Sequence, residues 1–317
     1  MPAQMEAPRV REAMTDSPPS YTTDAPLIGL MRYLFRLWPL ERGRGWLLRL
    51  CETVLGSGPL RFGIGGGAFV EGRLRDWIFR WTFMGLHDRD EPFQRSLAFL
   101  DRAAIVFDVG ANVGVWSLLA ARRNRTARIH AFEPAPATAA QLRRHVELNH
   151  AAVTVNECAV GADETSRPFF ALTEGNTGAS SFYSEVGGVA LDVPVTTLDA
   201  YVERKLLPAV DLIKVDAEGA EMLVFRGARR SISSETGPAI FFEVSDHLCE
   251  RSGVTVREVK QLLLDHGYRL YRWRGNRLSP VQVEESHSHE DLFALKSRHL
   301  EGPGAHVARD QARPSGG

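Results

Sequence analysis

Polar residues that could bind or activate a ligand follow several apolar runs of the sequence, each with the length of a buried strand. They are Asp108, Glu133, Asn156, Asp216, Glu218 and Glu243. A carboxylate accepts hydrogen bonds from hydroxyl groups and can take a proton in general-base catalysis. A carboxylate that is buried without partners protonates instead. Several acids near one another therefore indicate a site for a ligand that carries hydroxyl groups or an amine.

A glycine turn follows the first of these runs, from Ile105 to Gly114 (IVFDVGANVG). Gly110 and Gly114 lack a Cβ, so the backbone can approach a ligand and the next helix can pack closely on the strand. We expect the N-terminus of that helix to present free N–H groups to a carboxylate or a phosphate. Glycine spacing of this kind is a weak signal when it stands alone.

Glu133 strengthens the interpretation of the turn as a ligand site. It ends the next apolar run and lies 19 residues after Gly114. Dinucleotide-type folds place the acid that binds a ribose about 20 residues after the turn. A carboxylate there can accept from both ribose hydroxyls and would repel a 2′-phosphate. The alternative is an ordinary βαβ unit with an exposed acid, which we favour less because turn, helix and acid agree.

Strands and helices alternate from Ile105 onward. Core strands are predicted at 105–108, 128–133, 153–155, 210–216 and 239–244, with antiparallel edge strands at 268–273 and 292–296. Helices are predicted after the glycine turn and at 135–149, 198–205, 220–230 and 256–266. Residues 165–197 indicate a small β insertion, and Thr197 should cap the helix that follows. This order predicts an α/β fold, a doubly wound sheet whose ligand lies outside the carboxyl ends of its strands.

The chain divides by composition into four parts. We expect a disordered arm at 1–25, an N-terminal helical and accessory segment at 26–100, the ligand-binding domain at 101–298 and a disordered tail at 299–317. Residues 27–55 have apolar residues at helical spacing and several arginines, a pattern that fits either a membrane surface or packing on the main domain. We favour packing. Residues 63–72 predict a flexible turn before an accessory strand, and 76–84 fit a helix or a strand equally well.

Charge and cysteine content exclude some classes of protein. The 317 residues have a formal net charge of −1, so no bulk electrostatic attraction drives the chain toward nucleic acid. The three cysteines are far apart and form neither a metal motif nor a disulfide framework. The first residues show no secretory pattern, and no run reaches the roughly 18 apolar residues of a membrane helix. We therefore expect a cytoplasmic protein, and its oligomeric state is left open.

Five short runs resemble the FkbM family of S-adenosylmethionine-dependent methyltransferases. They are FDVGANVG (107–114), FEP (132–134), GNTGASS (175–181), TTLD (196–199) and IKVDAEGAE (213–221), within a similarity that extends from about 72 to about 274. The resemblance implies a class I methyltransferase fold, Rossmann-like, with seven strands of which the last is antiparallel. It also implies transfer of a methyl group from S-adenosyl-L-methionine to an oxygen, typically a hydroxyl of a sugar or a natural product.

The resemblance carries cofactor-binding roles onto single residues. Asp108 and Gly110 would meet the methionine moiety, while Asn112 and Gly114 would shape the same turn. Asparagine tolerates the left-handed backbone that such a turn needs. Glu133 would bind the ribose. Residues 156–159, with Asn156 and Ala159 at their ends, would flank the adenine.

The acidic residues after the fourth and fifth strands are candidate catalytic groups. A hydroxyl acceptor gains from a base within hydrogen-bond reach. Asp216 is our first choice, with Glu218 and Glu243 as the other candidates. Candidate substrate-binding residues are Asn176, Ser180, Lys214 and His247. A buried lysine is costly without a partner, so we expect Lys214 to pair with one of the acids; we expect His247 in a loop.

Other interpretations stay open at this point. Asp216 with Glu218 could hold Mg²⁺, but no third ligand is evident, so we predict no metal site. An NAD-binding oxidoreductase fits Glu133 but fits the GxNxG turn less well. A non-catalytic S-adenosylmethionine-binding protein is the second alternative. The expected partner is a small-molecule or glycan acceptor, not nucleic acid.

Overall fold

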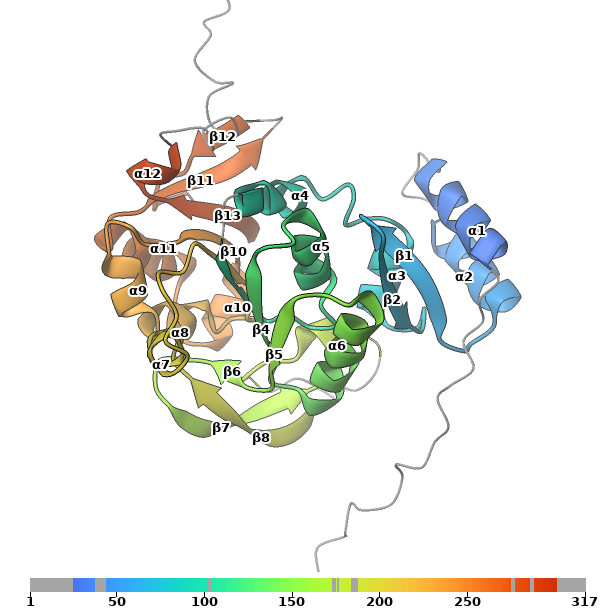
Figure 1. The fold of residues 1–317 in the computed structure, drawn as a ribbon, viewed down its shortest axis with the longest axis horizontal. Coiled ribbons are helices and arrows are strands. Elements are labelled where there is room, and N and C mark those ends of the chain that lie inside the picture. Colours follow the sequence, from blue (N-terminus) through green and yellow to red (C-terminus); the bar gives the residue numbers. More distant parts are fainter. Residues whose placement is uncertain are drawn as a thin grey trace, which may run out of the picture.

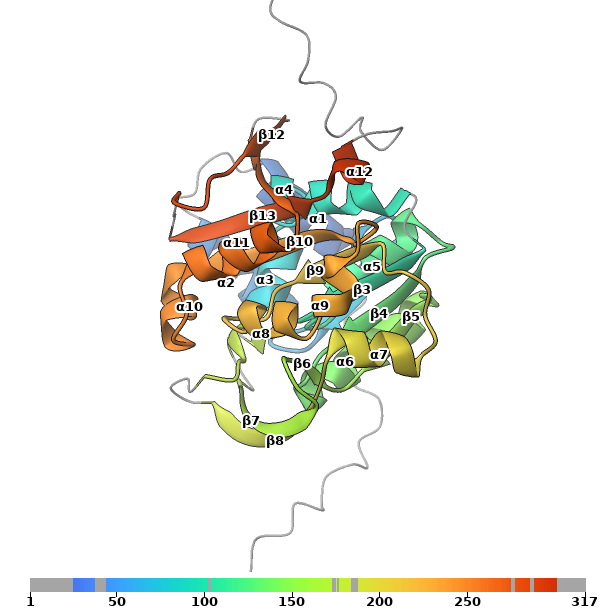
Figure 2. The same ribbon diagram turned by 90° about the vertical axis from the view of Figure 1, so that its left-hand side faces the viewer.

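A mixed eight-stranded sheet forms the centre of the protein. The computed structural model describes residues 25–37, 44–101, 104–172, 175, 177–183, 188–274, 277–285 and 288–300. From one edge to the other, the strands are β12 (Arg277–Pro280), β11 (Arg269–Arg274), β13 (His289–Leu295), β10 (Ala239–Ser245), β9 (Leu212–Val215), β3 (Ile105–Val109), β4 (Arg128–Phe132) and β5 (Val153–Asn156). Helices cover both of its faces (Figures 1 and 2).

Strand directions confirm the doubly wound sheet that the sequence predicts. The strands from β5 to β10 are parallel, and β13 runs antiparallel to both β10 and β11. The prediction that the strands at 268–273 and 292–296 are edge strands is wrong for both, because β13 lies between β10 and β11, and β12 forms the edge outside β11. β13 tolerates this position because its buried Glu290 is paired with Lys260 at 2.8 Å and with Arg272.

Alternation along the strands divides the side chains between two cores. In β3, Ile105, Phe107 and Val109 enter one core, and Val106 enters the other. The helices of the first core are α7 (Leu198–Arg204), α8 (Glu221–Arg226), α9 (Arg229–Ser233), α10 (Asp246–Arg251) and α11 (Val256–Asp265). The opposite side has α5 (Val115–Arg123) and α6 (Pro136–Asn149), and α12 (Ser297–Leu300) follows β13. Thr197 caps α7 as predicted, because its Oγ1 accepts from the Ala200 N–H at 3.0 Å.

The N-terminal segment shares the core of α5 instead of forming a core of its own. Its elements are α1 (Ala25–Leu37), α2 (Arg44–Leu55), β1 (Leu60–Gly65), β2 (Ala68–Gly72), α3 (Trp77–Phe83), α4 (Glu91–Ser96) and the 3-10 helix η1 (Leu97–Asp101). The flexible turn predicted at 63–72 is instead part of the β1–β2 hairpin. The undecided stretch 76–84 is the helix α3, which Asp76 caps by accepting from the Ile78 N–H.

The β insertion predicted at 165–197 is present as a small sheet. It contains β6 (Ala159–Val160), β7 (Thr165–Ala171) and β8 (Val189–Thr196), with the 3-10 helix η2 (Thr177–Ala179) between β7 and β8. The disordered ends predicted at 1–25 and 299–317 fall almost wholly outside the described residues, although α12 continues to Leu300. Among the helices that the structure describes, none combines the length and the apolar character that a bilayer span requires.

Candidate functional site

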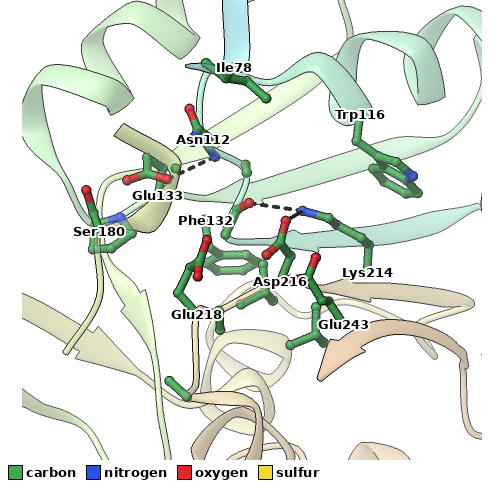
Figure 3. A pocket seen from close by; sticks show the side chains of 18 of the residues that line it. Ile78, Asn112, Trp116, Phe132, Glu133, Ser180, Lys214, Asp216, Glu218 and Glu243 are labelled. Atoms are coloured by element: carbon green, nitrogen blue, oxygen red, sulfur yellow. Dashed lines mark hydrogen bonds and ion pairs between the residues drawn. The ribbon is translucent and has the colours of Figure 1, made fainter. Parts of the chain in front are cut away.

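A cavity of about 480 Å³ opens at the carboxyl ends of β3, β4, β9 and β10. Its volume lies within the usual range for pockets that hold small molecules. Among the residues proposed from the sequence, nine line it: Gly110, Asn112, Glu133, Ala159, Ser180, Lys214, Asp216, Glu218 and Glu243. Figure 3 shows most of these side chains around one space, with Glu133 and Ser180 on one side and the acids of β9 and β10 on the other. Elements far apart in the sequence therefore meet here as predicted.

The glycine turn comes so close to strand β9 that only glycine fits at Gly110. Its φ is +72°, and a Cβ there would lie 1.7 Å from the Asp216 carbonyl oxygen. Asn112 also has a left-handed backbone, with φ of +49°, in agreement with the expectation for asparagine. The turn is therefore held in one shape by the neighbouring strand.

The N–H groups of the turn itself, from Gly110 to Gly114, are not free. Gly110 and Ala111 donate to the Phe132 carbonyl oxygen at 3.1 and 3.0 Å. The Val113 N–H is bonded to the Asn112 side chain, and the Gly114 N–H to the Ala111 carbonyl. A pyrophosphate would need such donors. The turn is thus built for close approach of a ligand and not for a phosphate group.

Glu133 accepts from the remaining N–H group of the turn, that of Asn112. Its Oε2 accepts from the Asn112 N–H at 2.9 Å, and its Oε1 accepts from the Ala135 N–H at 3.0 Å. Burial raises the pKa of Glu133 to about 7, against the opposing effect of these two hydrogen bonds. Each oxygen still has a lone pair for a further donor. A ligand with two adjacent hydroxyls would fit this carboxylate and would stabilise its ionised form.

Three of the residues expected at the cofactor lie behind the cavity wall. Asp108 is fully buried and accepts from Ser117 Oγ at 2.6 Å. Gly114 allows α5 to pack on α6, because a Cβ there would lie 2.2 Å from Leu142 Cδ1. The Asn156 side chain turns into the fold, where it accepts from the Tyr201 hydroxyl at 3.0 Å. These residues support the site from outside; Cys158, Ala159 and Val160 form the wall where the adenine was expected.

Lys214 lies between the glycine turn and the acidic residues of the cavity. As predicted, its Nζ pairs with acids, lying 3.2 Å from both Asp108 Oδ1 and Asp216 Oδ2. It also donates to the Gly110 carbonyl oxygen at 3.1 Å. Burial alone would lower the pKa of Lys214, but the two carboxylates raise it above its ordinary value. The ammonium is therefore a fixed structural cation that holds the turn, β3 and β9 together.

The far end of the cavity is acidic because of the register of the sheet. Glu243 of β10 lies directly opposite Asp291 of β13, and His289 Nδ1 lies 3.5 Å from Glu243 Oε1. Like charges directly opposite each other in a sheet are destabilising. Burial, followed by the charges of Asp216, Asp291, Glu218 and Glu221, raises the pKa of Glu243 well above its usual range. An unfavourable pair in a cavity wall indicates a functional role for these carboxylates.

Several lining residues were missed by the sequence analysis. They include Trp77, Trp81, Asp90, Phe93, His289 and Asp291. Trp77 and Trp81 stand one helical turn apart on α3 with stacked rings, 6.1 Å between centroids. That spacing was visible in the sequence, but their segment could not be assigned to a helix. His289 and Asp291 are two residues apart on β13, so their side chains share one face of the sheet. The strand predicted from the sequence began only at 292 and therefore left both residues out.

Two proposed substrate residues are placed differently from the rest. His247 is exposed on α10 instead of in a loop, and it does not line the cavity, because the helix begins directly after β10 and carries it away. Asn176 lies outside the described residues. Ser180 lines the cavity and its Oγ accepts from the Leu172 N–H at 2.9 Å. For metals, Glu243, His289 and Asp291 are the described side chains with donor atoms within 4.8 Å of one another.

The comparisons with known proteins agree with this geometry. The family model of the methyltransferase FkbM domain matches residues 108–270, about half of the chain. The chain belongs to the FkbM methyltransferase family. It is 33% identical over 147 residues to Methyltransferase 1 of Beauveria bassiana, covering 39% of this chain and 58% of that protein. It is 27% identical over 168 residues to the 31-O-demethyl-FK506 methyltransferase FkbM of Streptomyces tacrolimicus, covering 44% and 64%.

The chain thus matches less than two thirds of the length of these two relatives. Among solved structures, it is similar to TrmK of M. capricolum in complex with S-adenosyl-homocysteine, with 8% identity and a TM-score of 0.38. That match covers 65% of this chain and 67% of TrmK. As an FkbM methyltransferase, the protein uses S-adenosyl-L-methionine as its methyl donor. The NAD-binding alternative is therefore not retained.

The residues present fit this donor. A turn without free N–H groups suits a ligand that has no phosphate, and Glu133 offers two oxygens to a ribose. The side chains of Cys158, Ala159 and Val160 offer an apolar wall for a base. When bound, S-adenosyl-L-methionine supplies an electrophilic methyl group. The chain contributes the binding and alignment of the donor, which can supply much of the rate of an in-line displacement.

Replacing Glu133 by alanine tests the ribose contact. We expect the affinity for S-adenosyl-L-methionine to fall by roughly 1–3 kcal/mol, since two hydroxyl donors would lose their acceptor. Calorimetric titration measures the change. Asp211→Ala is the matched control, because Asp211 Oδ2 also accepts two backbone N–H groups, from Ala104 and Ile105, but at the other end of the sheet. Equal affinity in the Glu133 variant and the wild type would contradict the assignment.

Glu221 gives a second prediction, for stability against pH. Its Oε1 accepts from the Ala217 and Gly219 N–H groups, and burial raises its pKa to about 7 from an ordinary 4.5. Between these values the folded protein binds the proton more tightly than the unfolded chain does, so this group lowers stability as pH rises. The free energy of unfolding of Glu221→Gln, relative to wild type, should therefore be larger at pH 8 than at pH 5 by on the order of 1–3 kcal/mol, measured by urea unfolding without ligand.

The control for this prediction is the exposed Glu258, which caps α11 and whose pKa is lowered by its hydrogen bonds to Thr255. It is ionised at both pH values, so Glu258→Gln should change stability equally at pH 5 and pH 8. A Glu221→Gln difference that is the same at both pH values would show that Glu221 titrates normally.

Proposed function

We propose that the protein transfers a methyl group from S-adenosyl-L-methionine to a hydroxyl oxygen of a sugar, free or in a glycan or glycolipid, or of a natural product. The observation that carries this proposal is the acidic end of the cavity. Glu243 and Asp291 face each other there, beside the turn that receives the donor. A hydroxyl is a poor nucleophile and needs a base, and a carboxylate with a raised pKa is a stronger base than an ordinary one.

We propose Glu243 as this base, in place of Asp216, which the sequence favoured. Asp216 Oδ2 is 3.2 Å from the Lys214 ammonium, so its charge is already compensated. Among the described residues, the cationic group that lies beside Glu243 is His289, whose side chain is 56% exposed. As the acceptor oxygen bonds to the methyl carbon and the carbon–sulfur bond breaks, the hydroxyl proton passes to Glu243. Glu218 lines the same wall and would contact the acceptor.

The other walls support an acceptor with hydroxyls and apolar faces. Trp77, Trp81 and Phe93 form an aromatic side, and Ser180 adds a hydroxyl to the lining. Small-molecule sites commonly combine aromatic walls with a few polar groups that set orientation. The net charge of −1 does not favour a nucleic acid acceptor. The similar protein of Streptomyces tacrolimicus is named a 31-O-demethyl-FK506 methyltransferase, which supports transfer to an oxygen.

The deciding experiment offers radiolabelled S-adenosyl-L-methionine with panels of sugars, glycolipids and polyhydroxylated natural products. We expect label in a base-stable methyl ether of one hydroxylated class. Label in an amine or on carbon would contradict oxygen transfer. Tight binding of S-adenosyl-homocysteine without turnover on any panel would instead favour the non-catalytic alternative. Repeating the positive reaction after treatment with a chelator tests our prediction that no metal is needed, and loss of turnover would place a cation at Glu243, His289 and Asp291.

A further inference from the structure

The first two helices each have two apolar stripes, and only one stripe is needed for the fold. On α1 the inner stripe is Ile28, Met31 and Phe35, and on α2 it is Leu47, Cys51 and Leu55. All six side chains are buried and belong to the core that α5 shares. This confirms that the segment packs on the main domain, as the sequence analysis favoured. It does not account for the remaining apolar residues of either helix.

The outer stripes are exposed. On α1 they follow the i, i+3, i+4, i+7 spacing of one helix face: Leu30 (54% exposed), Tyr33 (56%), Leu34 (41%) and Leu37 (58%). On α2 they are Trp46 (64%), Leu50 (40%) and Val54 (48%), spaced by one turn each. Seven of the eleven large hydrophobic side chains that the described part of the chain exposes thus lie on these two helices.

The two outer stripes lie at different angles from the buried faces of their helices. On α1 the outer stripe lies roughly opposite the inner one, while on α2 each outer residue directly precedes an inner one, so its outer stripe flanks the buried face at about 100° around the helix. The helices lie next to each other at one end of the molecule, beyond β1 and β2 (Figure 1). A soluble monomer rarely exposes a large continuous apolar surface, and such surfaces mark sites of protein or membrane contact. Some partner is therefore expected to cover this one.

Charge and residue type identify the partner. Residues 25–55 contain five arginines and two glutamates, but Arg32 is buried and donates to the Gly63 carbonyl oxygen, so it does not face the surface. Arg49 is exposed and lies one turn from Trp46, while Glu52 lies 3.6 Å from Arg80 and so is partly compensated. Leucines with tryptophan and tyrosine beside arginines are the composition of helices that lie in a membrane interface. Aromatic rings with a polar edge prefer the headgroup level.

We propose that the outer stripes of α1 and α2 dock on the surface of a bilayer that contains anionic lipids. The leucines and Val54 would enter the boundary between headgroups and acyl chains, with the helix axes in the membrane plane. A second copy of the chain is the competing occupant of this surface, and the test below distinguishes it from a bilayer. The bilayer would leave the fold unchanged, because the inner stripes already satisfy the core.

The docking surface is joined to the cavity by α3. Phe83, at the end of α3, packs against Phe35 of α1 with ring centroids 6.0 Å apart. Trp77, at the start of the same helix, lines the cavity and is 50% exposed. Docking would therefore place the aromatic wall of the cavity only one short helix away from the lipid surface. The inference about docking does not depend on the acceptor that the cavity takes.

Flotation of the full chain with vesicles tests the proposal. We expect binding to vesicles of phosphatidylcholine with phosphatidylglycerol, and much weaker binding to phosphatidylcholine alone. Leu34→Glu and Trp46→Glu should each reduce the partition into anionic vesicles by about tenfold or more, since each removes an apolar side chain that would enter the lipid and adds a repelled charge. Leu206→Glu is the matched control, because Leu206 is 91% exposed but lies after α7, and binding should be retained.

Two results would overturn the proposal. One is no binding of the wild type to anionic vesicles at physiological ionic strength. The other is a dimer in solution without lipid, by light scattering, that Leu34→Glu and Trp46→Glu dissociate, which would assign the surface to a second copy. As a control for folding, each variant should unfold at the same temperature as the wild type, which would show that its core is intact. Methyl transfer to a water-soluble acceptor should be unchanged in both variants, which separates this test from that of the proposed function.

Discussion

Replacing Glu243 by glutamine is expected to lower kcat by roughly 10²–10⁴-fold, the range that a positioned general base contributes. Glutamine keeps the shape of the side chain but cannot take the proton of the acceptor hydroxyl. The affinity for S-adenosyl-L-methionine should stay the same, because Glu243 is at the acid end of the cavity and not at the turn (Figure 3). Single-turnover measurement with a saturating acceptor reports the loss directly.

The pH profile separates Glu243 from its neighbours. The charge of Asp291 contributes to the raised pKa of Glu243, so Asp291→Asn should move the rise of the rate with pH to lower pH. Asp216→Asn should also lower the pKa of Glu243, but the rate of methyl transfer should still rise with pH as Glu243 loses its proton. If Glu243→Gln retained kcat within about tenfold while Asp216→Asn lost it, the first choice of the sequence analysis would be the base after all.

Replacing Lys214 by methionine is expected to destabilise the fold by roughly 3–5 kcal/mol, the cost of leaving a buried charge without its partner. Asp108 has no exposed surface, and Lys214 supplies its positive partner at 3.2 Å. The turn would also lose the hydrogen bond from Lys214 to the Gly110 carbonyl. Urea unfolding at neutral pH measures the change in the free energy of unfolding.

A second replacement identifies the cause of this loss. Adding Asp108→Asn to Lys214→Met removes the uncompensated charge, so the double variant should recover part of the stability. Asp216→Asn should cost less than about 1 kcal/mol, because the Asp216 side chain is 38% exposed and its pair with Lys214 is screened by solvent. A double variant no more stable than Lys214→Met alone would show that lost packing, and not charge, is the cause.

The donor end of the site was predictable because its residues are close in sequence. Gly110 and Asn112 belong to one turn, and Glu133 ends the next strand at a spacing that the βαβ unit fixes. The order of strands followed from the alternation of apolar runs with helices. The sequence could not predict the hydrogen-bond partners of the turn. Its N–H groups donate to the Phe132 carbonyl, to the Glu133 carboxylate and to atoms of the turn itself, which only the three-dimensional structure shows.

The acid end was only half predictable, because it depends on which strands pair and in what register. Glu243 was identified as an acid that ends an apolar strand, but its partner Asp291 comes from β13, whose place inside the sheet the sequence did not indicate. Trp77 reaches the cavity through a helix that periodicity could not distinguish from a strand. Asn156 and His247 were predicted to line the site from their positions after core strands. Asn156 instead accepts a hydrogen bond from the Tyr201 hydroxyl inside the fold, and His247 lies on the helix α10, away from the cavity.

The insertion of β13 between β10 and β11 has a consequence for how members of such a family could diversify. His289 and Asp291 of the cavity come from β13, near the end of the chain, while the glycine turn follows the first core strand. A swap of the segment after α11 between relatives would exchange His289 and Asp291 without changing Gly110 or Glu133. New acceptor chemistry could thus arise by recombination at one boundary, downstream of α11.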